Sequence, residues 1–229
     1  ASSDCIDFLT SSISASLAII ESGTLGSLPD KVNSLIQIAK QNSLRLQHLI
    51  NNLLDMDKLL SNTIELYFTE FDAVQLIHKT ISENQYIANK HQIKFHISSA
   101  ENNCTIWADE ARTQQALTHL LSNAAKFSNA HTMVDISISA HNNFIKIMVT
   151  DHGVGIGPEF QTNIFNRFTQ EDSSSSRKKD GSGIGLSISK ELIEKMNGKI
   201  GFTSSIGQGS CFYFELPKAH QQIQHSESA

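Results

Sequence analysis

Two glycine-rich segments in the second half of the chain have residue types that suit contact with a small ligand. Ten of the twelve glycines lie between Gly153 and Gly209. The first segment, Asp151-His-Gly-Val-Gly-Ile-Gly157, directly follows a predicted strand. Glycine lets a ligand approach the backbone, and a carboxylate at a strand end can accept a hydrogen bond from an amine. The same pattern also occurs in ordinary turns, so both interpretations stay open for this segment taken alone.

The second segment, Gly181-Ser-Gly-Ile-Gly-Leu186, comes immediately before a predicted helix. Unshielded N–H groups at a helix N-terminus form an anion site that suits phosphate groups. No Gly-Lys-Ser or Gly-Lys-Thr follows, so this segment is not a P-loop. No early strand–helix–strand unit surrounds it, which excludes the dinucleotide-binding fingerprint.

A predicted helix from Asp109 to Ser128 carries a third group of polar residues. His119, Asn123 and Phe127 recur every four residues, and Lys126 lies beside them. An asparagine oxygen is a suitable Mg²⁺ ligand, and a lysine supplies positive charge to phosphate. Taken alone, this face could be a solvated helix edge. Together, the three segments predict a site for a nucleotide with its metal ion.

Alternating and helical apolar patterns predict the elements that carry these segments. The predicted strands lie at 64–68, 93–97, 134–138 and 145–149, around Phe202, and at 212–216. The predicted helices lie at 72–90, 109–128 and 183–196. Asp72 and Asp109 are the expected N-caps of the first two helices, and Asn197-Gly198 is the expected stop of the third. We expect them to form an α+β sandwich with a mixed sheet and helices on one face. Residues 166–182 are rich in Ser, Lys, Asp and Gly, which is typical of a mobile lid.

The first 62 residues are predicted to form a helical hairpin instead. A break at 22–30 separates two helices, and the second carries a heptad seam from Val32 to Leu60. Asn42 lies on the seam, where a polar residue fixes register. Two helices cannot bury this apolar surface alone, so we expect a dimeric four-helix bundle. The predicted domains are the hairpin at 1–62, the sandwich at 63–217 and a polar tail at 218–229.

Composition excludes several classes of protein. The net charge of −5 provides no overall basic field for nucleic acid or an acidic membrane. The longest apolar runs are a few residues, whereas a membrane span needs about 20. Three cysteines in 229 residues argue against a disulfide scaffold and favour a reducing compartment. The chain begins with Ala inside a predicted helix, so we expect a fragment of a longer protein.

The order of four motifs resembles the sensor histidine kinases. Asn123-Ala-Ala-Lys-Phe127, Asp151-x-Gly-x-Gly155, Phe165-x-x-Phe168 and Gly181-x-Gly-x-Gly-Leu186 are similar to the N, G1, F and G2 boxes of that family. The similarity in spacing extends from Ser3 to Pro217. It implies the Bergerat ATP-binding fold, ATP and Mg²⁺ as cofactors, and a cytoplasmic location, as a free protein or as the cytoplasmic part of a membrane-anchored sensor.

The resemblance also implies roles for individual residues. Asn123 would hold Mg²⁺, Lys126 would contact phosphate, and Asp151 would accept from the adenine amino group. Gly183 and Gly185 would line the triphosphate, under a lid at 166–182 anchored by Phe165 and Phe168. From the residues alone, Phe165 and Phe168 are predicted to be core aromatics, and both interpretations can hold. The full set of expected cofactor-binding residues is Asn123, Lys126, Phe127, Asp151, Gly153, Gly155, Ile156, Gly181, Ser182, Gly183, Ile184, Gly185 and Leu186.

His119 is a further candidate site residue. Gyrase-like ATPases of the same superfamily place a water-activating Glu one turn before the metal-binding Asn. A His at this position favours a phosphotransfer enzyme over a hydrolase.

The residue that should receive phosphate is missing. The family carries its phosphoacceptor His on the first helix, but the first histidine here is His48. Counting back from the loop places Asp4 at the acceptor position, and a register one heptad later places Ser11 there. Neither side chain has the imidazole nitrogen that acts as nucleophile. No residue is therefore assigned as catalytic.

These features predict a histidine-kinase core of a two-component signalling protein that binds ATP–Mg²⁺ but is degenerate for autophosphorylation. It would act as a regulatory partner, as a homodimer or as a heterodimer with another histidine kinase, and a response regulator or phosphotransfer domain is a further expected partner. One alternative is an active kinase that phosphorylates a His on a partner or another domain. The other is a dimerisation scaffold without catalysis.

Overall fold

The computed structural model describes residues 12–13, 15–21, 26, 29–101, 104–169 and 183–219. The chain divides into two compact units, residues 1–64 and residues 65–229. Several predicted features lie outside the described residues: Asp4, Ser11, Gly181, Ser182 and most of the predicted lid. The helices of the described residues include none that is both long enough and apolar enough to cross a membrane.

The first unit is helical in its described parts. Residues 12–13 and 15–21 are helical, and α2 runs from Asp30 to Leu60. Pro29 precedes α2 and its carbonyl accepts from the N–H groups of Val32 and Asn33. Six large apolar residues of the predicted heptad seam are exposed on α2: Val32, Leu35, Leu46, Leu49, Leu53 and Leu60.

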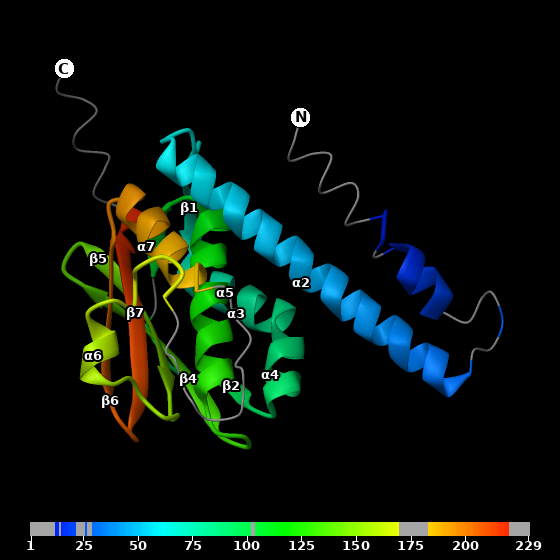
Figure 1. Ribbon diagram of the computed structural model, residues 1–229. Helices are drawn as coiled ribbons and strands as arrows, with labels where there is room; N and C mark the ends of the chain where they lie inside the picture. The colour runs from blue at the N-terminus through cyan, green and yellow to red at the C-terminus, as the bar shows by residue number, and fades with distance from the viewer. Residues whose placement is uncertain are drawn as a thin grey trace. The chain divides into compact units, whose positions relative to one another are not determined.

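The second unit contains two sheets (Figure 1). The smaller pairs β1 (Thr69–Asp72) with β3 (Thr105–Ala108) in antiparallel register. The larger has the order β2-β4-β5-β7-β6 and is mixed, since only the β2–β4 pair is parallel. Its strands are β2 (Lys94–Ala100), β4 (Met133–His141), β5 (Phe144–Asp151), β6 (Lys199–Ser205) and β7 (Gly209–Pro217).

The core lies between one face of the larger sheet and the helices. Alternate residues of the central strands are fully buried, such as Ile136, Ile147 and Phe214. Helices α5 (Glu110–Phe127) and α7 (Gly185–Lys195) pack against each other and against this sheet. The remaining helices are α3 (Ala73–Glu83), α4 (Gln85–His91) and the short α6 (Pro158–Gln161). The predicted α+β sandwich with a mixed sheet is confirmed.

Two predicted elements differ from the structure. The predicted strand at 64–68 is not a strand, and β1 begins only at Thr69, because the Tyr67 N–H donates to Asp109 Oδ2 instead of to a neighbouring strand. The predicted helix at 72–90 is two helices, α3 and α4, separated at Asn84. The Asn84 amide donates to the Thr80 carbonyl and thereby caps the end of α3.

The end of the second unit also extends beyond the predicted boundary. The Lys218 N–H donates to the Asn143 carbonyl, and Ala219 is buried. These two residues, which the sequence places at the start of the polar tail, therefore belong to the folded unit.

Candidate nucleotide-binding site

Helix α5 carries several of the candidate site residues and contacts both glycine segments. Its N-cap is Asp109, as predicted, whose carboxylate accepts from the Arg112 N–H. One side of the helix is fixed in the core by six buried apolar residues: Ala116, Leu117, Leu120, Leu121, Ala124 and Ala125. The side chains of His119, Asn123, Lys126 and Phe127 are half-buried. An α-helix rises about 1.5 Å per residue, so His119 and Phe127 lie about 12 Å apart along the axis.

The loop after β5 passes the C-terminal end of α5. Asp151 ends β5 and is buried, and its Oδ1 accepts from the Gly153 N–H at 2.9 Å. A Cβ atom at Gly153 would lie 2.1 Å from the Phe127 carbonyl oxygen. Real Cβ atoms do not approach so closely, so only glycine allows this loop to cross the helix end.

The same loop is held on its other side by β6. Gly155 has a φ of +69°, and a Cβ there would lie 2.0 Å from the Ser205 carbonyl oxygen. The Ile156 N–H donates to Ser204 Oγ at 2.9 Å. Close backbone packing alone therefore requires glycine at both positions of Asp-x-Gly-x-Gly, whether or not a ligand binds.

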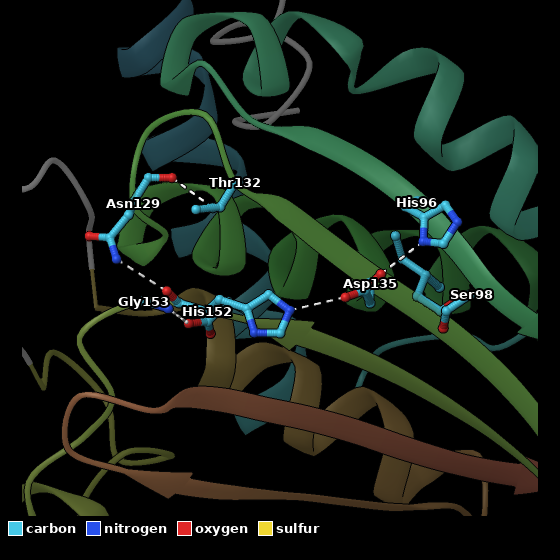
Figure 2. A network of polar contacts seen from close by, with 9 residues as sticks. His96, Ser98, Asn129, Thr132, Asp135, His152 and Gly153 are labelled. Carbon is cyan, nitrogen blue, oxygen red and sulfur yellow. Dashed lines mark hydrogen bonds and ion pairs between the residues drawn. The ribbon is translucent and has the colours of Figure 1, made fainter.

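The His152 carbonyl is held from a third direction. The Asn129 amide, just beyond α5, donates to it at 3.2 Å, and Figure 2 shows this bond beside the Gly153 N–H. Asn129 and Ser204 belong to no recognisable motif, so sequence reasoning missed both of them.

The start of α7 lies against α5 one turn before Asn123. A Cβ at Gly185 would lie 3.4 Å from Cγ and Cδ2 of His119, and His119 Nδ1 lies 3.0 Å from Ser189 Oγ. The Ser189 hydroxyl donates to the Gly185 carbonyl, so it accepts from His119 Nδ1, which places a proton on that nitrogen. The candidate residue His119 thus joins α5 to the N-terminus of α7.

The two ends of the predicted lid are joined at its base. The Phe168 N–H donates to the Gly183 carbonyl at 3.0 Å, and both residues have positive φ. Phe165 packs edge-on against Phe202 with ring centroids 5.9 Å apart, which agrees with its prediction as a packed aromatic. Phe168 is 65% exposed, so its interpretation as a core aromatic is wrong.

The residues available for a metal ion and for phosphate, Asn123 and Lys126, lie on α5 between His119 and Phe127. Within the described part of the chain, the Asn123 side-chain amide has no hydrogen-bond partner, so its oxygen can serve as a ligand. The Lys126 ammonium lies 4.8 Å from the centre of the Phe127 ring. The amide oxygen fits a Mg²⁺ ion that takes its other ligands from phosphates and water, and the ammonium can pair with a phosphate.

Two of the predicted glycines lie against α5. Gly153 contacts the end of α5 at Phe127, and Gly185 contacts it at His119, with Asn123 midway. Ile184 is buried directly before α7, and Leu186 is in its first turn.

Comparison with known proteins gives one consistent result. Residues 108–220 match the family described as histidine kinase-, DNA gyrase B-, and HSP90-like ATPase. Sensor histidine kinase RppB of Synechocystis sp. is 28% identical over 196 residues, which are 86% of this chain and 43% of RppB. Circadian input-output histidine kinase CikA of Synechococcus elongatus is 30% identical over 195 residues, 84% of this chain and 26% of CikA. The chain spans less than half the length of both relatives.

The fold of the chain also matches solved structures. The crystal structure of full-length ShkA in complex with AMPPNP matches with a TM-score of 0.71 and 27% identity, over 93% of this chain and 45% of ShkA. The mixed sheet with helices on one face is accordingly the histidine-kinase ATPase fold. The chain therefore carries a sensor-histidine-kinase catalytic core, with residues 108–220 as its histidine kinase-, DNA gyrase B- and HSP90-like ATPase domain.

Proposed function

We propose that this chain binds ATP with Mg²⁺ as the catalytic core of a two-component signalling protein. One observation carries the proposal: the two glycine segments contact α5 at Gly153 and Gly185, on either side of Asn123. A nucleotide between them would meet a buried carboxylate, an amide oxygen, an ammonium and a helix N-terminus within a span of two to three helical turns.

Each part of a nucleotide has a partner of matching chemistry. Asp151, held by the Gly153 N–H, would accept from the adenine amino group. Lys126 and the N–H groups at the start of α7 would face the phosphates. The Asn123 oxygen would ligate Mg²⁺, which offsets phosphate charge when bound. The remaining loop residues Gly155, Ile156, Gly181, Ser182, Gly183, Ile184 and Leu186 would supply backbone contacts to the ligand.

We propose further that the chain does not phosphorylate itself. No histidine precedes His48, and Asp4 or Ser11 stands where the family has its acceptor. An imidazole nitrogen attacks the γ-phosphate as a neutral nucleophile, whereas a carboxylate would have to form an acyl phosphate. The chain would then act as a regulatory partner whose nucleotide site controls its conformation or its pairing.

The pairing is proposed to use α2. Its heptad seam exposes six large apolar side chains, with Leu35 65% and Leu53 56% exposed. A second hairpin, from an identical chain or from another histidine kinase, would cover this seam in a four-helix bundle.

Radiolabelled ATP tests the degenerate assignment. The chain should take up no acid-labile label from [γ-³²P]ATP with Mg²⁺, whereas a variant with Asp4→His or Ser11→His should become labelled in the matching register. The added substitution Asn123→Ala should abolish that labelling and serves as the control for the nucleotide site. Acid-labile label on the unmodified chain would contradict the assignment.

A second candidate function is an active kinase whose acceptor histidine lies on a partner or on another domain. The retention of all nucleotide-site motifs beside the missing acceptor favours it. Mixing the chain with a histidine-bearing kinase hairpin or a phosphotransfer domain distinguishes the two functions, because only an active kinase would label the added protein. A scaffold without nucleotide would instead bind no ATP analogue at millimolar concentration in calorimetry.

A further inference from the structure

Two histidines and one aspartate form a chain of hydrogen bonds beside the candidate adenine loop. His96 Nδ1 lies 2.8 Å from Asp135 Oδ1, and His152 Nε2 lies 3.0 Å from Asp135 Oδ2. Figure 2 shows the three side chains in line, with Asp135 between the two imidazoles. They come from β2, from β4 and from the residue after β5, so the cluster links two strands to the loop.

His152 is the neighbour of Asp151 in the sequence, but the two side chains serve opposite faces of the sheet. Successive side chains of an extended segment point to opposite faces. Asp151 is 3% exposed and lies on the helix-covered face. His152 pairs with Asp135. Val134 and Ile136, on either side of Asp135 in β4, are buried on the helix-covered face, so Asp135 and His152 lie on the opposite face. A rotation of the backbone that moved His152 away from Asp135 would therefore also move the Asp151 carboxylate.

The loop is tethered at both ends of His152. Its imidazole contacts Asp135 and its carbonyl accepts from the Asn129 amide. The next N–H, that of Gly153, donates to Asp151 Oδ1. Gly153 also lies close against the Phe127 carbonyl. Because the neighbouring His152 is held by Asp135 and Asn129, we infer that it fixes the direction in which the loop leaves β5.

The cluster does not have the arrangement of a metal site. Across the described residues, no group of three His, Cys, Asp or Glu side chains could hold a metal ion. The hydrogen bonds from His96 and then from His152 lower the pKa of the Asp135 carboxyl, so it stays ionised at neutral pH.

Other charged or titratable groups share this face of the sheet. The strand registers place Lys94 of β2, Lys146 of β5, Cys211, Tyr213 and Glu215 of β7, and Lys199 of β6 on it. Lys146 is paired with Glu215 at 3.4 Å and lies 3.7 Å from the centre of the Tyr213 ring. Asp135 is the one carboxylate on this face of the described strands that contacts a histidine.

We propose that His152, held by Asp135, is a positioning residue for Asp151 in nucleotide binding. The inference rests on the proposed nucleotide site. The bond to Asp135 fixes His152 and, with it, the backbone that carries the Asp151 carboxylate, so loss of the bond weakens nucleotide binding. Exposed pairs of this kind correspond to roughly a two- to fivefold change in an equilibrium constant.

Calorimetry with AMPPNP and Mg²⁺ tests the proposal. His152→Gln and Asp135→Asn should each weaken AMPPNP affinity by about two- to fivefold. His141→Gln, which changes an exposed histidine at the far end of β4, should leave the affinity unchanged. Unchanged affinity in His152→Gln overturns the proposal.

Hydrogen exchange without nucleotide separates this proposal from the proposed function. His152→Gln should speed exchange of the Gly153 amide while the amides in the centre of α5 keep the rates of the unmodified chain. Equal Gly153 exchange in both proteins overturns the tether. A failure of the unmodified chain to bind AMPPNP instead overturns the nucleotide site and, with it, the effect of His152 on affinity.

Discussion

His119 lies against Gly185, so that a side chain at the first residue of α7 would meet the imidazole ring at 3.4 Å. The contact is supported by the 3.0 Å approach of His119 Nδ1 to Ser189 Oγ. One imidazole therefore sets the spacing between the helix that carries Asn123 and the helix N-terminus proposed to face phosphate. His119 acts in this arrangement through position, which differs from the water-activating role of a Glu at the same place.

The first prediction concerns this spacing. His119→Ala should lower AMPPNP affinity several-fold and destabilise the second unit by about 1 kcal/mol, because a half-buried ring and its hydrogen bond are both lost. His119→Gln, which retains a donor, should recover part of the affinity. Calorimetry and urea unfolding measure the two effects. A His119→Ala protein with unchanged affinity would show that the spacing of α5 and α7 does not depend on this ring.

The second prediction concerns the crossing of the loop and α5. Gly153→Ala should destabilise the second unit by about 3 kcal/mol or more, or displace the loop, because the new Cβ would lie 2.1 Å from the Phe127 oxygen. Gly207→Ala is the matched control. Gly207 has a φ of +75° but nothing within 4 Å of a Cβ, so backbone strain of about 1 kcal/mol is the expected cost. Urea unfolding compares the two variants, and equal losses would contradict the steric argument.

The third prediction separates the metal ligand from the rest of the site. Asn123→Ala should weaken AMPPNP binding at least tenfold in Mg²⁺ but leave metal-free binding in EDTA unchanged, because only the ligand oxygen is removed. Ser122→Ala, one residue earlier on α5, is the control and should match the unmodified chain in both buffers. Calorimetry in each buffer gives the comparison. Equal losses with and without Mg²⁺ would indicate that Asn123 contacts the nucleotide directly.

The fourth prediction follows from the lowered pKa of Asp135, whose first cause is the hydrogen bond from His96. Because the carboxylate is favoured in the folded state, its contribution to stability is present above the pKa of the unfolded chain, about 3.9. That contribution disappears as pH falls through the lower folded pKa. Urea unfolding should show Asp135→Asn less stable than the unmodified chain at pH 6, by an amount below about 1 kcal/mol, and the gap should close toward pH 3. A gap that is constant over this range would exclude the ionic contribution.

The sequence predicted the features that depend on neighbouring residues. Asp72 and Asp109 cap α3 and α5 as expected, because a capping carboxylate acts on N–H groups two or three residues away. Asn197 has a φ of 58° and stops α7 before Gly198, again a local signal. Strands β4 and β5 were predicted equally well, because the alternation of apolar and polar residues in the sequence matches their alternating burial.

What the sequence could not predict depends on distant contacts. Strand β3 has four residues and exists as the partner of β1, so its own pattern was too short to recognise. The break at Asn84 comes from a side-chain bond inside the helix, which hydrophobic spacing does not reveal. At the site, the motifs identified Gly153 and Gly185, but the Phe127 carbonyl and His119 ring that they contact became known only from the fold. The pairing of His152 with Asp135 has no motif at all.

The last prediction concerns the seam of α2. Leu49 and Leu53 are 40% and 56% exposed. The seam repeats from Val32 to Leu60, so a partner helix must run along that whole length to cover it, as it does in a helical bundle. Leu49→Glu should convert the proposed dimer to a monomer in light scattering at micromolar concentration, because a charge placed in the bundle core would be desolvated without a partner. Asn51→Glu adds the same charge to an exposed position off the seam and should leave the dimer intact. A monomeric mass for the unmodified chain would remove the dimer from the proposal, whereas a dimer in both variants would place the interface elsewhere than on this seam.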